Sequence, residues 1–187
     1  MLTIPAMFIK EGLPKLVSGL MEHASLKSPA LLFSCIGDHT SDNYPLQVGQ
    51  FESGDEELDL WLERSYVEGN GGGNEGESYG LAWFNAGNFV VTDAWEKRKQ
   101  KGFVFTIGDE PTLLNISGSA IKELYGKNIP EVSDNYAVKD LLVKAQETNH
   151  VFHIHVNHTG NRVTNMKSLL GQNCIEIKNY EEIPESI

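Results

Sequence analysis

Two short apolar runs that each end in Gly-Asp constrain the fold of this chain more than any other feature. The run at 30–36 leads into Asp38, and the run at 103–107 leads into Asp109. A continuous apolar run of this length is typical of a strand that is buried on both faces of a sheet. We therefore interpret both runs as buried strands that end in the same way.

Stretches with helical periodicity alternate with these and other short apolar runs. Further strands are predicted at 45–51, as an edge strand, and at 151–156 and 174–177. Helices are predicted at 6–24, from Asp55 to Tyr66, at 78–90, 117–125, 134–145, 164–170 and 181–187. Gly126 is expected to end one of these helices and Asp134 to cap the start of the next. Because strands alternate with helices, we predict an α/β fold with a mainly parallel sheet and helices on both faces.

Length and charge limit the classes of protein that fit. A chain of 187 residues suits one domain, which we place at 1–187. The net charge of -11 repels phosphate backbones, so we do not expect a nucleic-acid partner. No apolar run is long enough to cross a bilayer and no signal-type segment opens the chain, so we expect a soluble, cytoplasmic protein. We interpret the two cysteines, Cys35 and Cys174, as buried thiols.

Acidic side chains follow both Gly-Asp strand ends and suggest a cation site. In an open parallel sheet, ligands bind outside the carboxyl ends of the strands. Asp38 and Asp109 are expected there, with Asp42 just beyond the first and Asn74 in the glycine-rich loop at 68–77. Such oxygen atoms are the ligands that Mg²⁺ and other hard divalent cations prefer. An aspartate in this position can also hold a turn or cap a helix, and that alternative stays open.

Four histidines, at 150, 153, 155 and 158, form a second group of interest. On a strand, His153 and His155 point to the same face, where they could bind zinc together. No cysteine or carboxylate lies nearby in the sequence to complete a zinc site. We therefore favour packed, hydrogen-bonded histidines over metal ligands.

Two common catalytic patterns are missing from the sequence. The glycine-rich loop contains no lysine and matches neither the P-loop nor the dinucleotide-binding pattern. No Gly-x-Ser-x-Gly segment is present to position a nucleophilic serine. We therefore expect neither a phosphate cradle nor serine-nucleophile catalysis.

The block 45–51 (PLQVGQF), the glycine-rich stretch 68–79 and the segment 105–111 (FTIGDEP) together resemble the von Willebrand factor A (VWA)-like proteins of bacteria and their phages. This resemblance implies a Rossmann-like, doubly wound fold with a metal-ion-dependent adhesion site. In that family the site uses an Asp-x-Ser-x-Ser loop after the first strand, a threonine in a glycine-rich loop and an aspartate after the fourth strand. By resemblance, Asp109 holds the last position, and Asn74 replaces the threonine. No Asp-x-Ser-x-Ser segment occurs, so the implied site is degenerate and the first strand is either upstream or lost.

The resemblance implies a non-catalytic protein-interaction module. A cation at the degenerate site would keep one coordination position open for a carboxylate of the partner, and relatives of this kind work beside AAA+ ATPases. A metal-assisted hydrolase using Asp38, Asp109 and His155 is the first alternative. A metal-free structural protein of an assembly is the second. A homo-oligomer also stays open, because an exposed sheet edge can pair with another chain.

Overall fold

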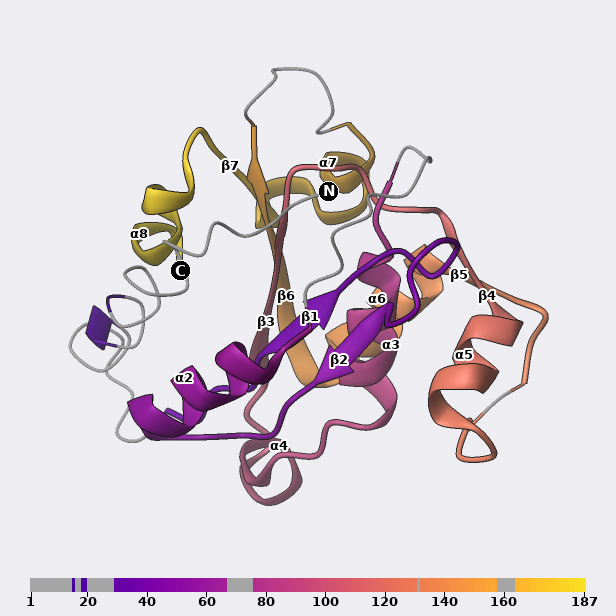
Figure 1. Ribbon diagram of the computed structural model, residues 1–187, viewed down its shortest axis with the longest axis horizontal. Helices are drawn as coiled ribbons and strands as arrows, with labels where there is room; N and C mark the ends of the chain where they lie inside the picture. The colour runs from indigo at the N-terminus through magenta and orange to yellow at the C-terminus, as the bar shows by residue number, and fades with distance from the viewer. Residues whose placement is uncertain (1–14, 16–17, 20–28, 67–75, 131, 158–163) are drawn as a thin grey trace.

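A computed structural model describes residues 15, 18–19, 29–66, 76–130, 132–157 and 164–187 (Figure 1). Nearly all of the helix predicted at 6–24 lies outside these residues. The same is true of Asn74 and of most of the glycine-rich loop. In the part of the chain that the structure describes, no helix is long and apolar enough to span a bilayer.

A three-stranded parallel sheet forms the centre of the fold. Its strands are β3 (Gly102–Gly108), β6 (Asn149–Val156) and β7 (Cys174–Ile177), in the order β3-β6-β7. The register sets Gly108 opposite His155, and His155 opposite Glu176. The carboxyl ends of the three strands therefore lie at one edge of the sheet. These three strands, and their parallel pairing, confirm the predicted α/β class.

The first Gly-Asp strand is not part of this sheet, so its predicted role was wrong. β1 (Ser34–Ile36) is only three residues long, partly exposed, and pairs antiparallel with β2 (Leu46–Val48). The chain turns back after Asp38, and an antiparallel partner can be reached through such a short connection, whereas a parallel partner needs a crossover. The prediction of a mainly parallel sheet thus holds for the three central strands and fails for this hairpin.

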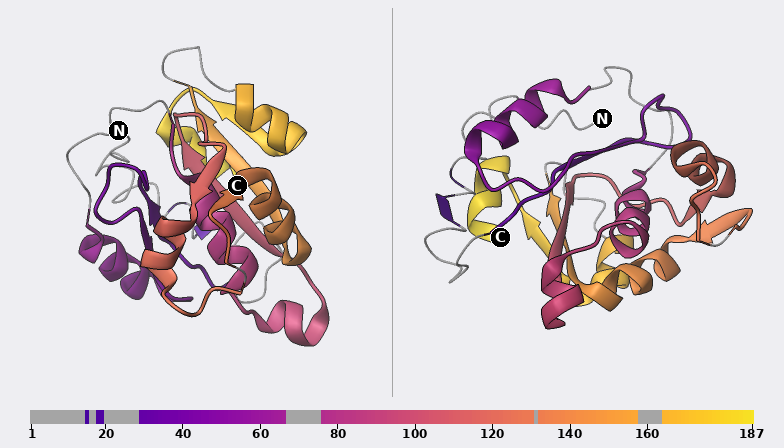
Figure 2. Two further views of the ribbon diagram at one scale, coloured as in Figure 1. Left: turned by 90° about the vertical axis from the view of Figure 1, so that its right-hand side faces the viewer. Right: turned by 90° about the horizontal axis from the view of Figure 1, so that it is seen from below.

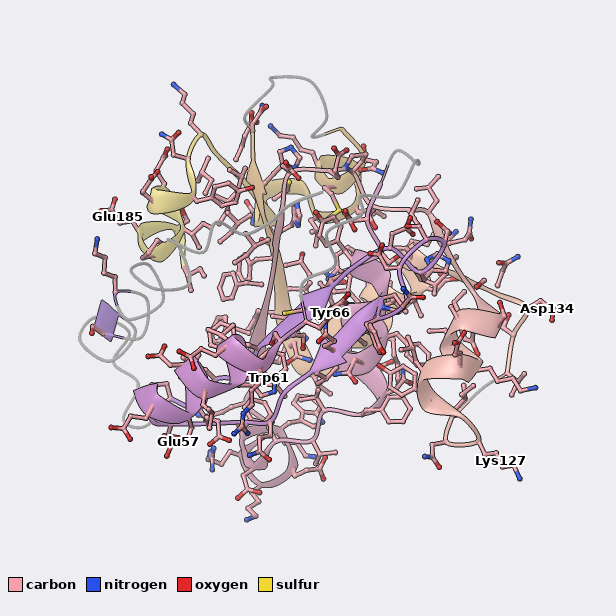
Figure 3. All side chains as sticks on the ribbon, in the orientation of Figure 1. Glu57, Trp61, Tyr66, Lys127, Asp134 and Glu185 are labelled. Carbon is pink, nitrogen blue, oxygen red and sulfur yellow. The ribbon has the colours of Figure 1, made fainter. Side chains whose placement is uncertain are left out.

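A second antiparallel pair corrects the prediction for Asp134. β4 (Asn115–Ser117) pairs with β5 (Asn135–Ala137), and α6 (Val138–Thr148) begins only after β5. Asp134 therefore does not cap a helix; its backbone carbonyl accepts a hydrogen bond from Gly118 N–H at 2.8 Å. Figure 3 shows Asp134 at the periphery, beside α5. Strand pairing has overridden the local capping preference.

The remaining helices follow the predicted pattern except for α4, which was not predicted. They are α2 (Asp55–Arg64), α3 (Tyr79–Asn88), α4 (Asp93–Arg98), α5 (Gly118–Tyr125), α7 (Thr164–Leu170) and α8 (Ile183–Ser186), with short 3-10 turns η2 (Gly171–Asn173) and η3 (Tyr180–Glu182). As predicted, α5 ends at Gly126, which has the positive φ of 61° that a side chain disfavours. The helix predicted from Asp55 to Tyr66 is shorter than expected, because α2 ends at Arg64 and Tyr66 lies beyond it and is exposed.

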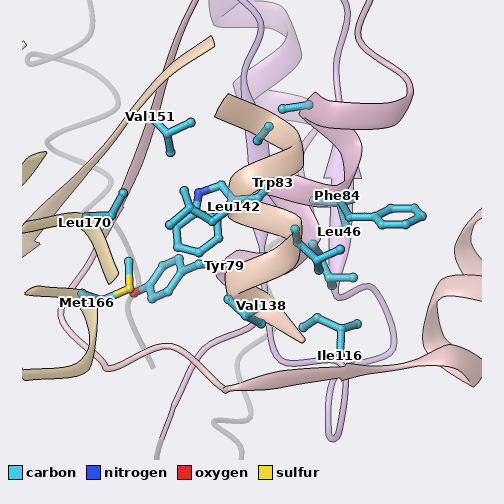
Figure 4. Close-up of a cluster of buried hydrophobic side chains, with 14 of the residues drawn as sticks. Leu46, Tyr79, Trp83, Phe84, Ile116, Val138, Leu142, Val151, Met166 and Leu170 are labelled. Atoms are coloured by element: carbon cyan, nitrogen blue, oxygen red, sulfur yellow. The ribbon is translucent and has the colours of Figure 1, made fainter. Parts of the chain in front are cut away.

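Helix α3 is the buried element around which the layers assemble. Its side chains Leu81, Trp83 and Phe84 are at most 3% exposed and pack with residues of α6, α7 and β6 (Figure 4). The hairpin and α2 lie on one side of the molecule, and α6 and α7 on the other (Figure 2). The face of the sheet that points away from α3 packs against Ile183 of α8. Both cysteines are free thiols; Cys174 is buried as predicted, whereas Cys35 is partly exposed and was predicted to be buried.

Candidate functional site

Both Gly-Asp ends meet at the carboxyl edge of the parallel sheet, where Glu77 lies between them. Burial, together with the negative charges of Asp38, Asp42 and Asp109, raises the pKa of Glu77 to about 7. The Glu77 N–H donates to the carbonyl of Pro111 at 2.8 Å, which joins this segment to the chain after Asp109. Three of the four predicted ligands thus act on the same buried carboxyl group but are not gathered into one metal-holding group among the described residues, and the fourth, Asn74, lies outside those residues.

Asp38 is held by its own loop. Its carboxylate accepts hydrogen bonds from Thr40 N–H at 2.9 Å, Thr40 Oγ1 at 2.7 Å, Ser41 Oγ at 3.1 Å and Ser78 Oγ at 3.4 Å. Asp42 closes the same turn, since its Oδ2 accepts the Asp38 N–H at 2.7 Å. These contacts match the alternative in which an aspartate after a strand organises a turn. Asp38 and Asp42 thus have structural roles that do not require a metal.

His39 fastens this loop to two other elements. Its Nδ1 lies 2.7 Å from Ser78 Oγ, and its Nε2 accepts the Ser117 N–H at 3.2 Å. Because Nε2 is an acceptor, the ring is neutral and carries its proton on Nδ1. Burial lowers the pKa of His39, against the opposing effect of Asp38. The sequence analysis missed His39 and Ser78; the only signal was that His39 directly follows Gly-Asp.

Asp109 has different surroundings from Asp38. Its Oδ1 is buried and has no hydrogen-bond partner among the described residues. Its charge raises the pKa of Glu77, of Tyr79 in α3 and of Tyr180 in η3, in each case adding to a larger effect of burial. The charge of Asp109 therefore acts on groups of α3 and η3 as well as on Glu77.

Two buried histidines lie on the face of the sheet that packs against α3. His153 and His155 have their ring centroids 5.7 Å apart and are 0% and 1% exposed. His153 Nδ1 bonds to Thr106 Oγ1 at 3.0 Å, and its ring packs edge-on against Tyr79. His153 Nε2 and His155 Nδ1 are buried and have no partner among the described residues. Both histidines are packed as predicted, and His153 is hydrogen-bonded, whereas no hydrogen bond of the His155 ring is found among the described residues.

Burial also sets the charge of this pair. Burial and, to a smaller extent, the neighbouring His155 lower the pKa of His153 to about 3. The pKa of His155 is lowered by burial as well, while Glu176, Asp109 and Glu110 act in the opposite direction. Both rings are therefore neutral at neutral pH, the state in which a ring nitrogen can bind a metal.

The carboxylates do not form a closed metal cage. Within the described ranges, no three histidine, cysteine, aspartate or glutamate side chains are grouped so that they could hold a metal ion. Mg²⁺ commonly binds through one or two carboxylates and keeps several waters. A cation at Asp109 would therefore have coordination positions that these side chains leave open.

Comparison with known proteins found no matching family model, no matching curated protein and no matching solved structure. The resemblance to VWA-like proteins thus stays a prediction from sequence motifs. The argument for function depends on the geometry of the site itself.

Proposed function

We propose that this protein is a non-catalytic binding module that recognises a partner protein through a divalent cation at Asp109. The observation that carries the proposal is the buried Asp109 Oδ1, which no described group donates to, at the centre of an acidic edge. A buried carboxylate oxygen without a partner costs free energy, and a bound cation removes that cost. Asp38 and Asp42 support the edge by shaping the loop beside it.

The open coordination positions favour a role in recognition. With fewer than three protein ligands in the described part of the chain, a cation is expected to bind weakly to the free protein. A carboxylate supplied by a partner would complete the shell, so cation and partner would bind cooperatively. An AAA+ ATPase remains the partner class that the VWA resemblance suggests.

The alternative of a metal-assisted hydrolase has less support. It needs Asp38, Asp109 and His155 around one cation, with a base close to the metal-bound water. The oxygens of Asp38 already accept four hydrogen bonds, and His155 is 1% exposed. This arrangement favours binding over turnover.

Calorimetric and thermal titration with Mg²⁺ and Mn²⁺ tests the proposal. We expect binding heat and a raised Tm for the native protein, because a ligand that binds only the folded state stabilises it. Asp109→Asn is expected to lose both signals. Asp59→Asn, which changes an exposed carboxylate in the middle of α2, is expected to keep them.

Two results would contradict the proposal. The first is the native protein showing neither heat nor a change in Tm with either cation. The second is Asp109→Asn binding as tightly as Asp59→Asn. Hydrolysis of a phosphoester by the native protein with Mn²⁺, absent from Asp109→Asn, would support the hydrolase instead.

A further inference from the structure

We propose that His39 is a pH-sensitive latch, which in its neutral form fastens the 38–42 loop to α3 and β4 and on protonation lets go of β4. The inference goes beyond the proposed function, because the latch requires no cation. It assigns a regulatory role to a side chain outside the proposed cation site.

The contacts of His39 join three parts of the chain. The residue lies in the turn between β1 and β2, and its ring reaches Ser78 at the start of α3 and Ser117 at the end of β4. Its backbone N–H also donates to Ser78 Oγ at 3.0 Å. By contrast, the hydrogen bonds that Thr40 donates to Asp38 stay within the loop. The contacts of His39 therefore tie the loop to the elements beside it.

The two ring contacts require different roles of the two ring nitrogens. Nε2 accepts the N–H of Ser117 at 3.2 Å, so it carries no proton. Nδ1 carries the proton and donates it to Ser78 Oγ at 2.7 Å. An imidazolium has a proton on both nitrogens. Protonation would therefore set two N–H groups against each other at the Ser117 contact, whereas the Ser78 contact is unaffected.

Burial makes this conflict costly. The side chain of His39 is only 5% exposed, so water does not readily reach the ring in the closed loop. A buried donor without an acceptor destabilises the folded state, and both the Ser117 N–H and the new Nε2–H would be in that condition. A movement of the loop that brings water to these groups removes the cost. Protonation therefore favours release.

The groups around the ring act on its charge in opposite directions. Asp38, in the same loop, has a carboxylate oxygen 3.8 Å from Nδ1 and favours the imidazolium. Ser78 and Ser117, from the other two elements, carry no charge, and the pKa of the neighbouring Glu77 is about 7. Burial outweighs the effect of Asp38 and lowers the pKa of His39 below its usual 6.5. The stability that the latch contributes is therefore present above pH 6.5 and lost as pH falls through the lower pKa of the folded state.

Release of the loop would change the acidic edge. In the closed form Asp38 is 3% exposed and Ser78 is 0% exposed. A loop that moves away from β4 would expose both, together with the start of α3 next to Glu77. We therefore expect this edge to be closed at neutral pH and open in mild acid.

NMR of the native protein, with a chelator present to exclude metal binding at Asp109, tests the latch directly. At neutral pH we expect a coupling across the hydrogen bond between the amide nitrogen of Ser117 and His39 Nε2. The coupling should vanish as the ring titrates with a midpoint below pH 6.5, and the amide signal of Ser117 should shift with the same midpoint. The variant Glu77→Gln should give the same midpoint, because it removes the neighbouring group that titrates in this range.

Two variants test whether the titrating group is His39 itself. His39→Gln offers Ser117 a side-chain oxygen as acceptor but does not titrate, so the Ser117 amide signal should stay constant over the same pH range. His150→Gln is the matched control, because it removes an exposed histidine, and its Ser117 signal should shift as in the native protein.

Several results would overturn the latch. The measurements on the native protein decide the case even where His39→Gln does not fold: the latch is wrong if the coupling is absent at neutral pH or persists while the ring protonates. A His39 midpoint at or above pH 6.5 would also contradict it. So would a folded His39→Gln whose Ser117 amide signal shifts with pH as in the native protein.

Discussion

The two Gly-Asp strand ends have the same local sequence and reach the same edge of the fold, yet their aspartates have different surroundings. Asp38 accepts four hydrogen bonds, and three of them come from Thr40 and Ser41 in the same turn. Asp109 has a buried oxygen without a partner and is surrounded by groups from other elements. The carboxylate at a strand end can therefore either accept hydrogen bonds from its own loop or stay available to a ligand. Which of the two occurs depends on the residues that follow it.

The glycines of the two pairs differ in the same way. A Cβ on Gly108 would overlap the hydroxyl of Tyr79, a fully buried side chain of α3. A Cβ on Gly37 would meet only the end of the Asp42 carboxylate. The Asp109 end is thus packed against the core, while the Asp38 end lies against its own turn.

Replacing each aspartate by alanine should give the largest difference between the two ends. Asp38→Ala leaves the Thr40 N–H and three hydroxyl groups without an acceptor, so we expect a loss of about 2–4 kcal/mol in the free energy of unfolding. Asp109→Ala removes a carboxylate oxygen that is buried without a partner among the described residues, so stability should be unchanged or higher. Urea unfolding in the presence of a chelator measures both. Equal losses in the two variants would show that the carboxylates have equivalent roles.

Alanine at the two glycines should give a smaller difference. Gly108→Ala is expected to cost about 1–3 kcal/mol, because the methyl group displaces Tyr79 from a packed core. Gly37→Ala should cost less, since a terminal carboxylate can rotate away. Neither glycine has a positive φ, so the comparison measures space and not backbone strain.

Adding Tyr79→Phe to Gly108→Ala sharpens this prediction. The second change removes the hydroxyl that the methyl group would overlap, so thermal unfolding should show that the double variant recovers part of the loss. If Tyr79→Phe destabilises the Gly108→Ala variant as much as it destabilises the native protein, the two changes are independent and the proposed overlap is wrong.

The pKa of Glu77 reports on both ends at once and should show the smallest effect. Asp38→Asn is expected to lower that pKa more than Asp109→Asn does, because the charge of Asp38 has the larger influence. In both variants the pKa should remain above 4.5, since burial is the largest cause of the shift. NMR titration of the Glu77 carboxyl carbon measures the pKa in each variant. A larger fall of this pKa in Asp109→Asn would show that Asp109, and not Asp38, has the larger influence.

The raised pKa of Glu77 also has a consequence for stability. The folded state holds this proton more tightly than the unfolded state does, so the contribution of Glu77 to stability is present below pH 4.5. It is lost as pH rises from 4.5 to about 7. Glu77→Gln should therefore lose less stability than the native protein over that interval. If the stability of Glu77→Gln depends on pH as strongly as that of the native protein, the group that titrates in this interval is not Glu77.

Much of the fold could be predicted because its strongest signals are local. The runs at 103–107, 151–156 and 174–177 became parallel strands, and the apolar stretch at 78–90 became the buried helix α3. β4 and β5 were missed because each has three residues, too few for an alternating pattern. Asp134 looked like a cap because capping preference is local, whereas the pairing of β5 with β4 is not.

The site could be predicted only in part. Asp38 and Asp109 were predicted at one edge because strand ends that share a direction collect there, but β1 belongs to a separate antiparallel pair, so this reason applies to Asp109 alone. Their difference could not be read from the sequence, because it depends on Ser78, forty residues from Asp38, and on Tyr79 and His155 beside Asp109. Such contacts between distant segments are set by packing.

The most direct test of a cation at Asp109 is a crystal structure of the protein soaked in Mn²⁺, with anomalous diffraction recorded to locate the metal. We predict one anomalous peak within bonding distance of the Asp109 carboxylate, and none at Asp38. A peak at Asp38 with none at Asp109 would contradict the account. So would the absence of any peak at this edge after soaking at a saturating Mn²⁺ concentration.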